Sequence, residues 1–254
     1  MEFVDSHCHL DLEQFDPHRS SLLTLMRQRG VAKLVIPAIS AGGWDRLLAV
    51  AQSDVALYPA LGIHPWCAAE PMAEPLARLE QMLTAMSVQA VGEVGLDFVK
   101  GMVDRELQLQ RLHPQLALAQ KVDLPLILHC RKAHQPLLQL VRSYPGVRGV
   151  VHAFSGSAEE AKRWQEHGFL LGIGGGILHP NYRRLQQVVT TLPLSAFLLE
   201  SDAPYQPLPS TMGISTPEVI PRIAAEIARL QHCSLAEVAE ITTANAWRLF
   251  RFDH

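Results

Sequence analysis

The chain has 254 residues, 48% of which are hydrophobic, and its mean hydropathy is +0.09. A chain of this length can bury a large core as one or two domains, and α/β barrels often use it as a single domain. Its formal charge of -3 at pH 7 excludes a protein that coats nucleic acid through a general positive field, so any phosphate binding must rely on local groups or metal ions.

The cysteines and the N-terminal segment indicate a cytoplasmic protein. The four cysteines form neither a C-x-x-C pair nor the dense spacing of secreted domains, which favours reduced thiols; they are Cys8, Cys67, Cys130 and Cys233. The first residues carry acids where a signal peptide has its basic segment, and no apolar run is long enough to span a membrane. We therefore expect neither export nor membrane insertion, and nothing in the sequence indicates an obligate protein partner.

Short apolar runs alternate with amphipathic segments along the whole chain. The runs predict eight strands, at residues 3–7, 33–38, 56–62, 90–96, 125–130, 149–154, 169–175 and 197–201. The amphipathic segments predict helices at residues 19–30, 42–53, 73–86, 104–122, 133–144, 157–168 and 181–192, followed by two more at 216–231 and 234–250. Thr216 is the predicted N-cap before Pro217, and Ser234 is the predicted N-cap of the last helix.

Eight strand–helix units in about 250 residues are what a (β/α)8 TIM barrel needs. The continuous apolar strands suit a parallel sheet that is buried on both faces. No linker divides the chain, so we expect one α/β domain over residues 1–254 with an extra C-terminal helix. A doubly wound open sheet is the alternative that periodicity leaves open.

Ionisable side chains stand where the predicted strands end. In VDSHCHLDL (residues 4–12), alternation along a strand would direct Asp5, His7, His9 and Asp11 to one face. The later strands add Glu93, His129, His152, Glu200 and Asp202. The carboxyl ends of barrel strands meet at one face, and burying so many such groups without partners is costly. The four imidazoles with two of these carboxylates already exceed one closed zinc site and suit two divalent ions with a bridging carboxylate.

Six short motifs together resemble the TatD family of metal-dependent deoxyribonucleases, within the amidohydrolase-type barrels. They run in the expected order from residue 5 to about residue 205: the pair His7 and His9, GIHPW (62–66), VGEVGLD (91–97), LHCR (128–131), VHAFSG (151–156) and ESDAPY (200–205). The resemblance implies a TIM barrel that cuts phosphodiester bonds in DNA with metal-activated water.

The resemblance also implies roles for single residues. His7, His9 and Asp202 would hold one ion, His129 and His152 the second, and Glu93 would bridge the two, where other amidohydrolases use a carbamylated lysine. Asp202 would also take the proton of the attacking water, which makes Asp202 and Glu93 the predicted catalytic residues. Donor sets of this kind accept Zn, Mn, Mg, Fe or Ni.

Further predictions concern residues around the ligands. Asp5 and Glu200 are predicted to accept hydrogen bonds from the ligand histidines and so to fix which ring nitrogen carries the proton. Arg131 and His64 are candidates for phosphate contacts. The glycine-rich LGIGGGI (171–177) lacks the residues of a P-loop, so we expect it to serve tight packing.

The remaining histidines fall on predicted helices, loops or the terminus, where a solvated surface is the default. They are His18, His113, His134, His167, His179, His232 and His254.

Residues 203–217 depart from the family pattern. After Asp202 the family often has a cysteine, and further on an arginine and an Asn-Glu-Pro element, whereas this chain reads APYQPLPSTMGISTP. We expect the altered segment to face the substrate. An ester or amide hydrolase with the same metal site is therefore an alternative, and a metal-retaining binding or scaffold protein is a third reading.

Overall fold

The structure, a computed structural model, describes residues 1–207 and 213–252. Within these residues, eight parallel strands form one sheet in the order β1-β2-β3-β4-β5-β6-β7-β8. The strands are β1 (Phe3–Asp5), β2 (Val31–Pro37), β3 (Leu57–Leu61), β4 (Ala90–Asp97), β5 (Leu126–Arg131), β6 (Gly149–Val151), β7 (Phe169–Ile173) and β8 (Phe197–Leu199). Strand order follows chain order without a reversal, which excludes the doubly wound alternative.

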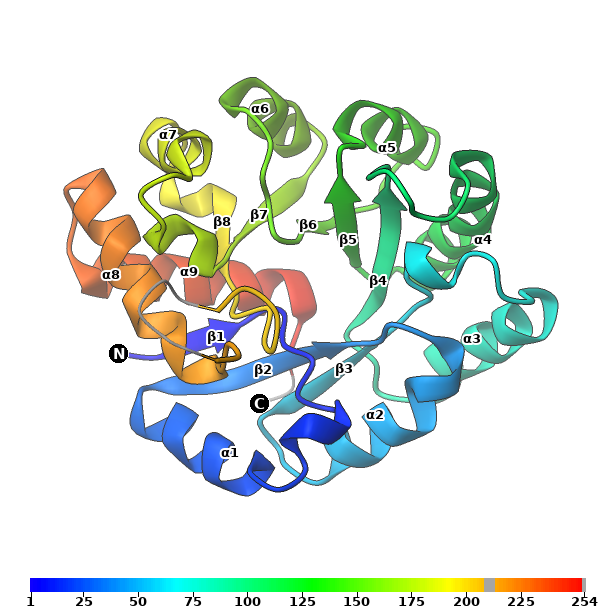
Figure 1. Cartoon of the computed structure of the whole chain (residues 1–254), viewed down its shortest axis with the longest axis horizontal. Coiled ribbons are helices and arrows are strands. Elements are labelled where there is room, and N and C mark those ends of the chain that lie inside the picture. Colours follow the sequence, from blue (N-terminus) through cyan, green and yellow to red (C-terminus); the bar gives the residue numbers. More distant parts are fainter. Residues whose placement is uncertain (208–212, 253–254) are drawn as a thin grey trace.

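The sheet closes on itself between its first and last strands. The backbone N–H of Ser6 donates to the carbonyl of Leu199 at 2.9 Å, and Cys8 forms a parallel bridge with Ala203. Figure 1 shows the strands at the centre with helices arranged around them. The predicted TIM barrel is confirmed.

The α-helices follow the predicted segments. They are α1 (Arg19–Gln28), α2 (Trp44–Gln52), α3 (Ala73–Ala85), α4 (Arg105–Val122), α5 (His134–Val141), α6 (Ala158–Glu166), α7 (Arg183–Thr191), α8 (Ile220–Gln231) and α9 (Leu235–Phe250). Short 3-10 helices lie before α1 and between the later elements: η1 (Glu13–Phe15), η2 (Ala41–Gly43), η3 (Pro65–Cys67), η4 (Gly175–Leu178), η5 (Leu194–Ala196) and η6 (Pro217–Val219). No helix of the described residues is long and apolar enough to cross a membrane.

One predicted cap is confirmed and one is wrong. Ser234 accepts the N–H of Glu237, whose side chain accepts the N–H of Ser234 in return, and this capping box starts α9. Thr216 makes no side-chain cap: Pro217 begins a 3-10 turn, and α8 starts only at Ile220.

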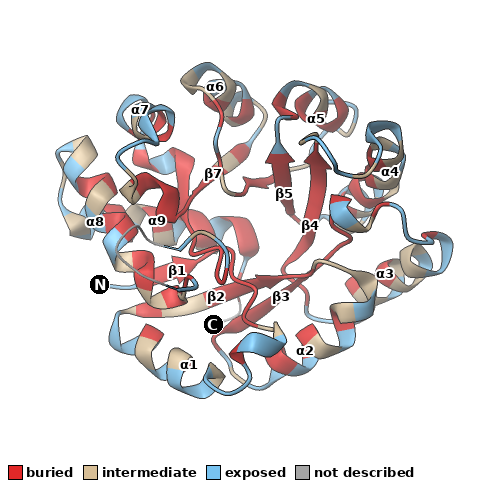
Figure 2. Ribbon diagram, in the orientation of Figure 1, coloured by how far each residue is buried: buried red, intermediate tan, exposed pale blue. Residues whose placement is uncertain are grey.

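The hydrophobic core has two layers, and polar side chains occupy one end of the barrel interior. Alternate strand residues such as Val35, Ile127 and Leu198 fill the interior of the barrel and pack with Phe250 and Phe252 from the C-terminal segment. The larger cluster packs the outer faces of the strands against the helices. The strands are buried and the outer helix faces are exposed (Figure 2). Helix α9 contacts β1 and β8, and its residues belong to the interior cluster. The buried polar side chains of the barrel interior therefore lie at the other end, towards the carboxyl ends of the strands.

Candidate metal centre

The barrel brings all six predicted ligands to the carboxyl ends of its strands. His7 and His9 follow β1, Glu93 lies in β4, and His129 lies in β5. His152 comes directly after β6, and Asp202 comes after β8. All six side chains are buried, with at most 7% of any residue exposed. Residues from five strands far apart in the sequence therefore converge on one point.

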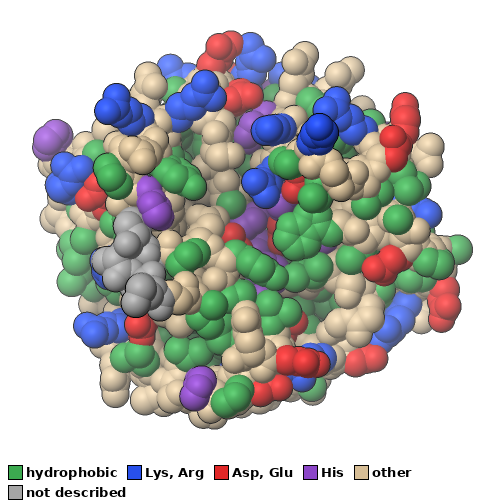
Figure 3. All heavy atoms as spheres, viewed as in Figure 1, with side chains coloured by type: hydrophobic (Ala, Val, Ile, Leu, Met, Phe, Trp, Pro, Cys, Tyr) green, Lys and Arg blue, Asp and Glu red, His purple; other side chains and the backbone are tan. Residues whose placement is uncertain are grey.

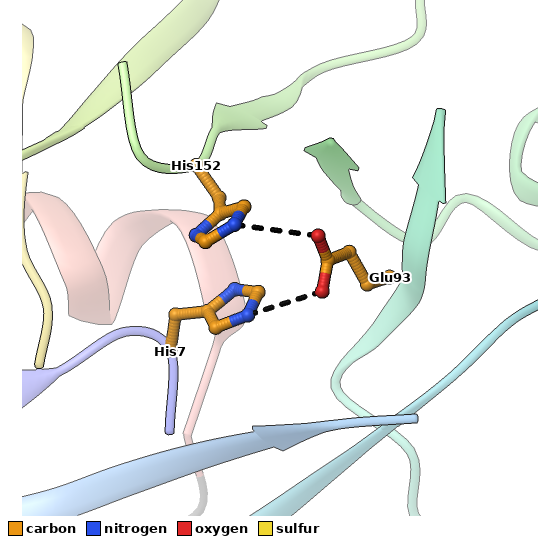
Figure 4. A group of neighbouring side chains, drawn as sticks. All are labelled: His7, Glu93 and His152. Atoms are coloured by element: carbon orange, nitrogen blue, oxygen red, sulfur yellow. Dashed lines mark ion pairs between the residues drawn. The ribbon is translucent and has the colours of Figure 1, made fainter. Parts of the chain in front are cut away.

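Glu93 lies between two sets of imidazoles. Its Oε2 is 3.2 Å from Nε2 of His7 and 3.6 Å from Nε2 of His9. Its Oε1 is 2.8 Å from Nδ1 of His129 and 3.3 Å from Nε2 of His152. Figure 4 shows His7 and His152 each directed at a different oxygen of this carboxylate. The two oxygens thus face the two ligand sets that the sequence predicts.

Asp202 completes the first set. Its Oδ1 is 3.8 Å from Nε2 of both His7 and His9, and its Oδ2 accepts a hydrogen bond from Nε2 of Gln206 at 2.9 Å. One carboxylate oxygen therefore faces the imidazoles and the other is held by an amide from the altered segment.

Glycines on either side of Glu93 let β4 approach β5 closely. A Cβ at Gly95, where φ is +149°, would lie 2.0 Å from the carbonyl oxygen of His129. A Cβ at Gly92 would lie 2.6 Å from Cβ of Ile127. Only glycine fits such spaces, so the pattern VGEVGLD brings Glu93 against His129.

The donor atoms fit divalent metal ions. Nε2 of His7 lies 3.1 Å from Nε2 of His9, so the lone pairs of two ring nitrogens converge. Ligand atoms bound to zinc at about 2.0–2.1 Å in tetrahedral geometry lie about 3.3 Å apart, close to these spacings. Three overlapping groups of residues have donor atoms close enough together to hold a metal ion: His7, His9 and Asp202; His7, Glu93 and His152; and His64, Glu93 and His129.

His64 is better described as a hydrogen-bond donor than as a ligand. It is 2% exposed, and its Nε2 lies 3.3 Å from Oε1 of Glu93. Its Nδ1 accepts the backbone N–H of Trp66 at 3.1 Å. A neutral ring whose Nδ1 is an acceptor carries its proton on Nε2, so it presents N–H to the centre. The metal group that includes His64 is therefore disfavoured by its tautomer.

The two supporting acids have different partners. Oε1 of Glu200 lies 3.2 Å from Nδ1 of His152 and accepts the backbone N–H of Ala153 at 2.7 Å, so Glu200 contacts an imidazole as predicted. Oδ1 of Asp5 instead accepts the backbone N–H groups of His7 and Ser201, at 3.2 and 2.9 Å. The expectation that Asp5 fixes a tautomer is wrong, because the chain turns after β1 and the carboxylate meets backbone first.

Asp97 is a partner that the sequence analysis missed. Its Oδ2 lies 3.1 Å from Nε2 of His129 and accepts Nε1–H of Trp66 at 3.4 Å. Asp97 is four residues after Glu93 on the same strand, and alternation places both on one face. That periodicity was the available signal. With Asp97 on Nε2, His129 presents Nδ1 to Glu93.

The other sequence predictions have mixed outcomes. Gly172 packs tightly as expected of the glycine-rich segment, since a Cβ there would lie 2.0 Å from Oε2 of Glu200. His134 is buried, contrary to the surface prediction, because it begins α5 and packs against α6, where Nε1–H of Trp164 donates to its Nδ1 at 3.2 Å. His254 lies outside the described residues, as do positions 208–212 of the altered segment.

In the metal-free protein, burial and neighbouring charges determine which side chains of the centre carry a proton. Burial would lower the pKa of His152, but the carboxylates of Glu93, Glu200 and Asp202 raise this pKa to about 10. Burial raises the pKa of Asp202 to about 7. Burial would also raise the pKa of Glu93, but the imidazoles of His152, His64 and His7 hold it well below its usual value.

A cavity of about 380 Å³ opens above these groups. Glu93 and His129 line it together with exposed Arg131 at the end of β5 and with Trp66 and Tyr205. Figure 3 shows histidines inside a central hollow on this face, with Lys and Arg side chains beside it towards α5, α6 and α7. The hollow therefore combines a carboxylate–imidazole floor with a partly basic edge.

Comparison with known proteins agrees with this geometry. The family model described as TatD related DNase matches residues 4–251. The chain belongs to the TatD family. This confirms the resemblance carried by the six motifs.

Three relatives place the chain within the TatD family. The metal-dependent hydrolase YjjV of Escherichia coli K12 is 37% identical, over 98% of this chain and 97% of the relative. Its crystal structure superposes with a TM-score of 0.94, over 99% of this chain and 98% of that one. The 3'-5' ssDNA/RNA exonuclease TatD of Erwinia tasmaniensis is 31% identical, over 97% of this chain and 98% of the relative. Human deoxyribonuclease TATDN3 is 30% identical, over 97% of this chain and 94% of the relative.

Proposed function

We propose that this TatD-family chain is a metal-dependent hydrolase that cleaves phosphodiester bonds in single-stranded nucleic acid. The observation that carries the proposal is the position of Glu93, whose two oxygens face two separate sets of imidazoles. Relatives that match almost the whole chain are named as a single-strand exonuclease and a deoxyribonuclease. The hydrolase forms one catalytic domain over residues 1–254, and its four free cysteines support a cytoplasmic location.

His7, His9 and Asp202 would hold one divalent ion, His129 and His152 would hold a second, and Glu93 would contact both. Bound ions acidify water and balance the negative charge on the attacking and leaving oxygens of a phosphodiester. The nitrogen and oxygen donors suit Zn, Mn, Mg, Fe or Ni, so the metal available to the protein decides occupancy.

The chain's own residues bind and orient the substrate and move the proton. Asp202 accepts the proton of the attacking water through the carboxylate that Gln206 holds in place. His64 donates Nε2–H to a phosphoryl oxygen, because its Nδ1 is already occupied by the amide of Trp66. Arg131 lines the cavity at the exposed end of β5 and contacts a phosphate of the bound nucleic acid strand. The cavity of about 380 Å³ lies near the lower end of the small-ligand range, which suits one nucleotide at a time.

Metal binding is expected to release protons. At pH 8 the metal-free protein holds a proton on His152, whose pKa is raised to about 10, whereas a metal ligand must be neutral. Adding Zn to metal-free protein with a pH indicator in weak buffer should therefore acidify the solution. His152→Gln should release about one proton fewer, and the difference should vanish above pH 10, where His152 is already neutral. An identical release from both proteins at pH 8 would contradict this assignment.

The activity test is hydrolysis of end-labelled single- and double-stranded DNA by metal-stripped protein, before and after reloading with Mg, Mn or Zn. We expect no cleavage without metal, restored cleavage with it, and a preference for single strands. The product ladder also gives the direction of cleavage. Failure to cut any DNA, with about two metal ions bound per chain, would refute the proposal and direct the search to esters and amides.

A further inference from the structure

Two aromatic side chains remain exposed in the wall of the cavity. Trp66 is 43% exposed and Tyr205 is 41% exposed, and both line the cavity together with Glu93. By contrast, Trp44 and Trp164 are fully buried in the core. Exposed rings beside a reaction centre provide apolar surface that a ligand can cover.

The structure already holds both rings in place. The indole of Trp66 donates Nε1–H to Oδ2 of Asp97 at 3.4 Å, and its ring meets the His64 imidazole at 4.4 Å between centroids. The ring of Tyr205 packs against His9 with 5.5 Å between centroids. Because residues of the candidate metal centre fix both rings, a stacking ligand loses little affinity to ordering them.

The two rings form a corner beside both halves of the centre. Their centroids are 6.5 Å apart and their planes meet at 89°. The Trp66 ring lies 6.3 Å from the ring of His129, and Tyr205 contacts His9 of the other ligand set. A nucleobase is joined to its phosphate through one sugar, so a nucleotide whose phosphate lies above His129 can reach the Trp66 ring, 6.3 Å away, with its base.

We propose that Trp66 and Tyr205 form a nucleobase subsite, in which the base next to the scissile phosphate stacks on the indole and packs against the phenol. This subsite rests on the proposed function, since it requires a nucleic acid substrate. Stacking tolerates every base, because each base has a π face. The subsite therefore accepts unpaired nucleotides of any sequence, whereas the bases of a duplex are already stacked on one another.

The experiment removes the ring from the protein and the base from the substrate. Metal-loaded protein cleaves end-labelled single-stranded oligonucleotides with either an intact nucleotide or an abasic residue next to the cleaved bond, and the two kcat/KM values are compared. We expect the unmodified protein to prefer the intact nucleotide by about 10- to 100-fold, the size of one base–aromatic stacking contact. Trp66→Ala should remove this preference, and Tyr205→Ala should reduce it. Trp66→Phe keeps a stacking ring and should retain most of it.

Tyr182→Ala is the matched control. Tyr182 is 50% exposed and lines the same cavity, but its ring packs against His179 and not against the metal centre. The preference for the intact nucleotide should survive this change. The metal content of each variant is measured as well. A variant that loses the preference but keeps its metal has lost only the subsite, whereas a variant that loses metal has a damaged metal centre.

Two failures are distinguishable. Equal preference in the unmodified protein and in Trp66→Ala would overturn the subsite and leave the hydrolase standing. No cleavage of any DNA by the metal-loaded unmodified protein would overturn the proposed function and the subsite together.

Discussion

Glu93→Gln is expected to lower hydrolysis of single-stranded DNA by more than about 100-fold, since loss of a partner that only orients a metal ligand already costs 10- to 100-fold. The change removes the charge that faces His7 and His129 through different oxygens. A side-chain amide offers one acceptor oxygen and one NH2 donor group, so it cannot serve both imidazole sets as an acceptor. We therefore expect metal content per chain to fall together with activity.

Elemental analysis and the cleavage assay test this prediction side by side. Glu106→Gln is the matched control, because Glu106 is exposed in the first turn of α4, the helix that follows β4. It should keep both metal and activity. A Glu93→Gln protein with full metal content and full activity would show that Glu93 does not bridge the centre.

Asp202→Asn is expected to lower kcat by about 100- to 10,000-fold, the range for a positioned general base. An asparagine fits the same space, but its amide cannot take a proton from water at neutral pH. The single amide oxygen can face either Gln206 or the ion that His7 and His9 would hold, but not both, so metal content is measured beside kcat. KM for single-stranded DNA should change much less than kcat.

Single-turnover cleavage and a DNA-binding titration separate the two quantities. Asp104→Asn is the control, because Asp104 caps α4 by accepting the N–H of Leu107 and asparagine caps equally well. An unchanged kcat in Asp202→Asn would remove Asp202 from the proton transfer. Loss of DNA binding with an unchanged kcat would assign it to substrate binding instead.

The altered segment after Asp202 now has a physical role in its described part. Gln206 holds the Asp202 carboxylate, and Tyr205 provides one wall of the proposed subsite. The departure from the family pattern at these positions therefore lies beside the candidate metal centre and lines the cavity. The departure therefore concerns substrate binding and leaves the predicted metal ligands unchanged.

The sequence by itself determined the barrel and the six residues at its centre. Eight apolar runs separated by helices leave few topologies, and parallel strands of one barrel all end at the same face. A histidine at or directly after the end of a strand, such as His129 or His152, therefore lies near the centre whatever loop follows it. The glycines on either side of Glu93 allow β4 to approach β5 closely, since larger side chains at these positions would overlap atoms of β5.

Only the tertiary structure decided what each of the surrounding side chains touches. His64 faces Glu93 because the amide of Trp66 fixes its ring, and Asp97 supports both His129 and Trp66. Asp5 turned out to hold backbone N–H groups instead of an imidazole. Periodicity tells which face of a strand a residue occupies. Hydrogen-bond partners from other strands depend on distances of a few ångströms, which are set by packing across the whole barrel.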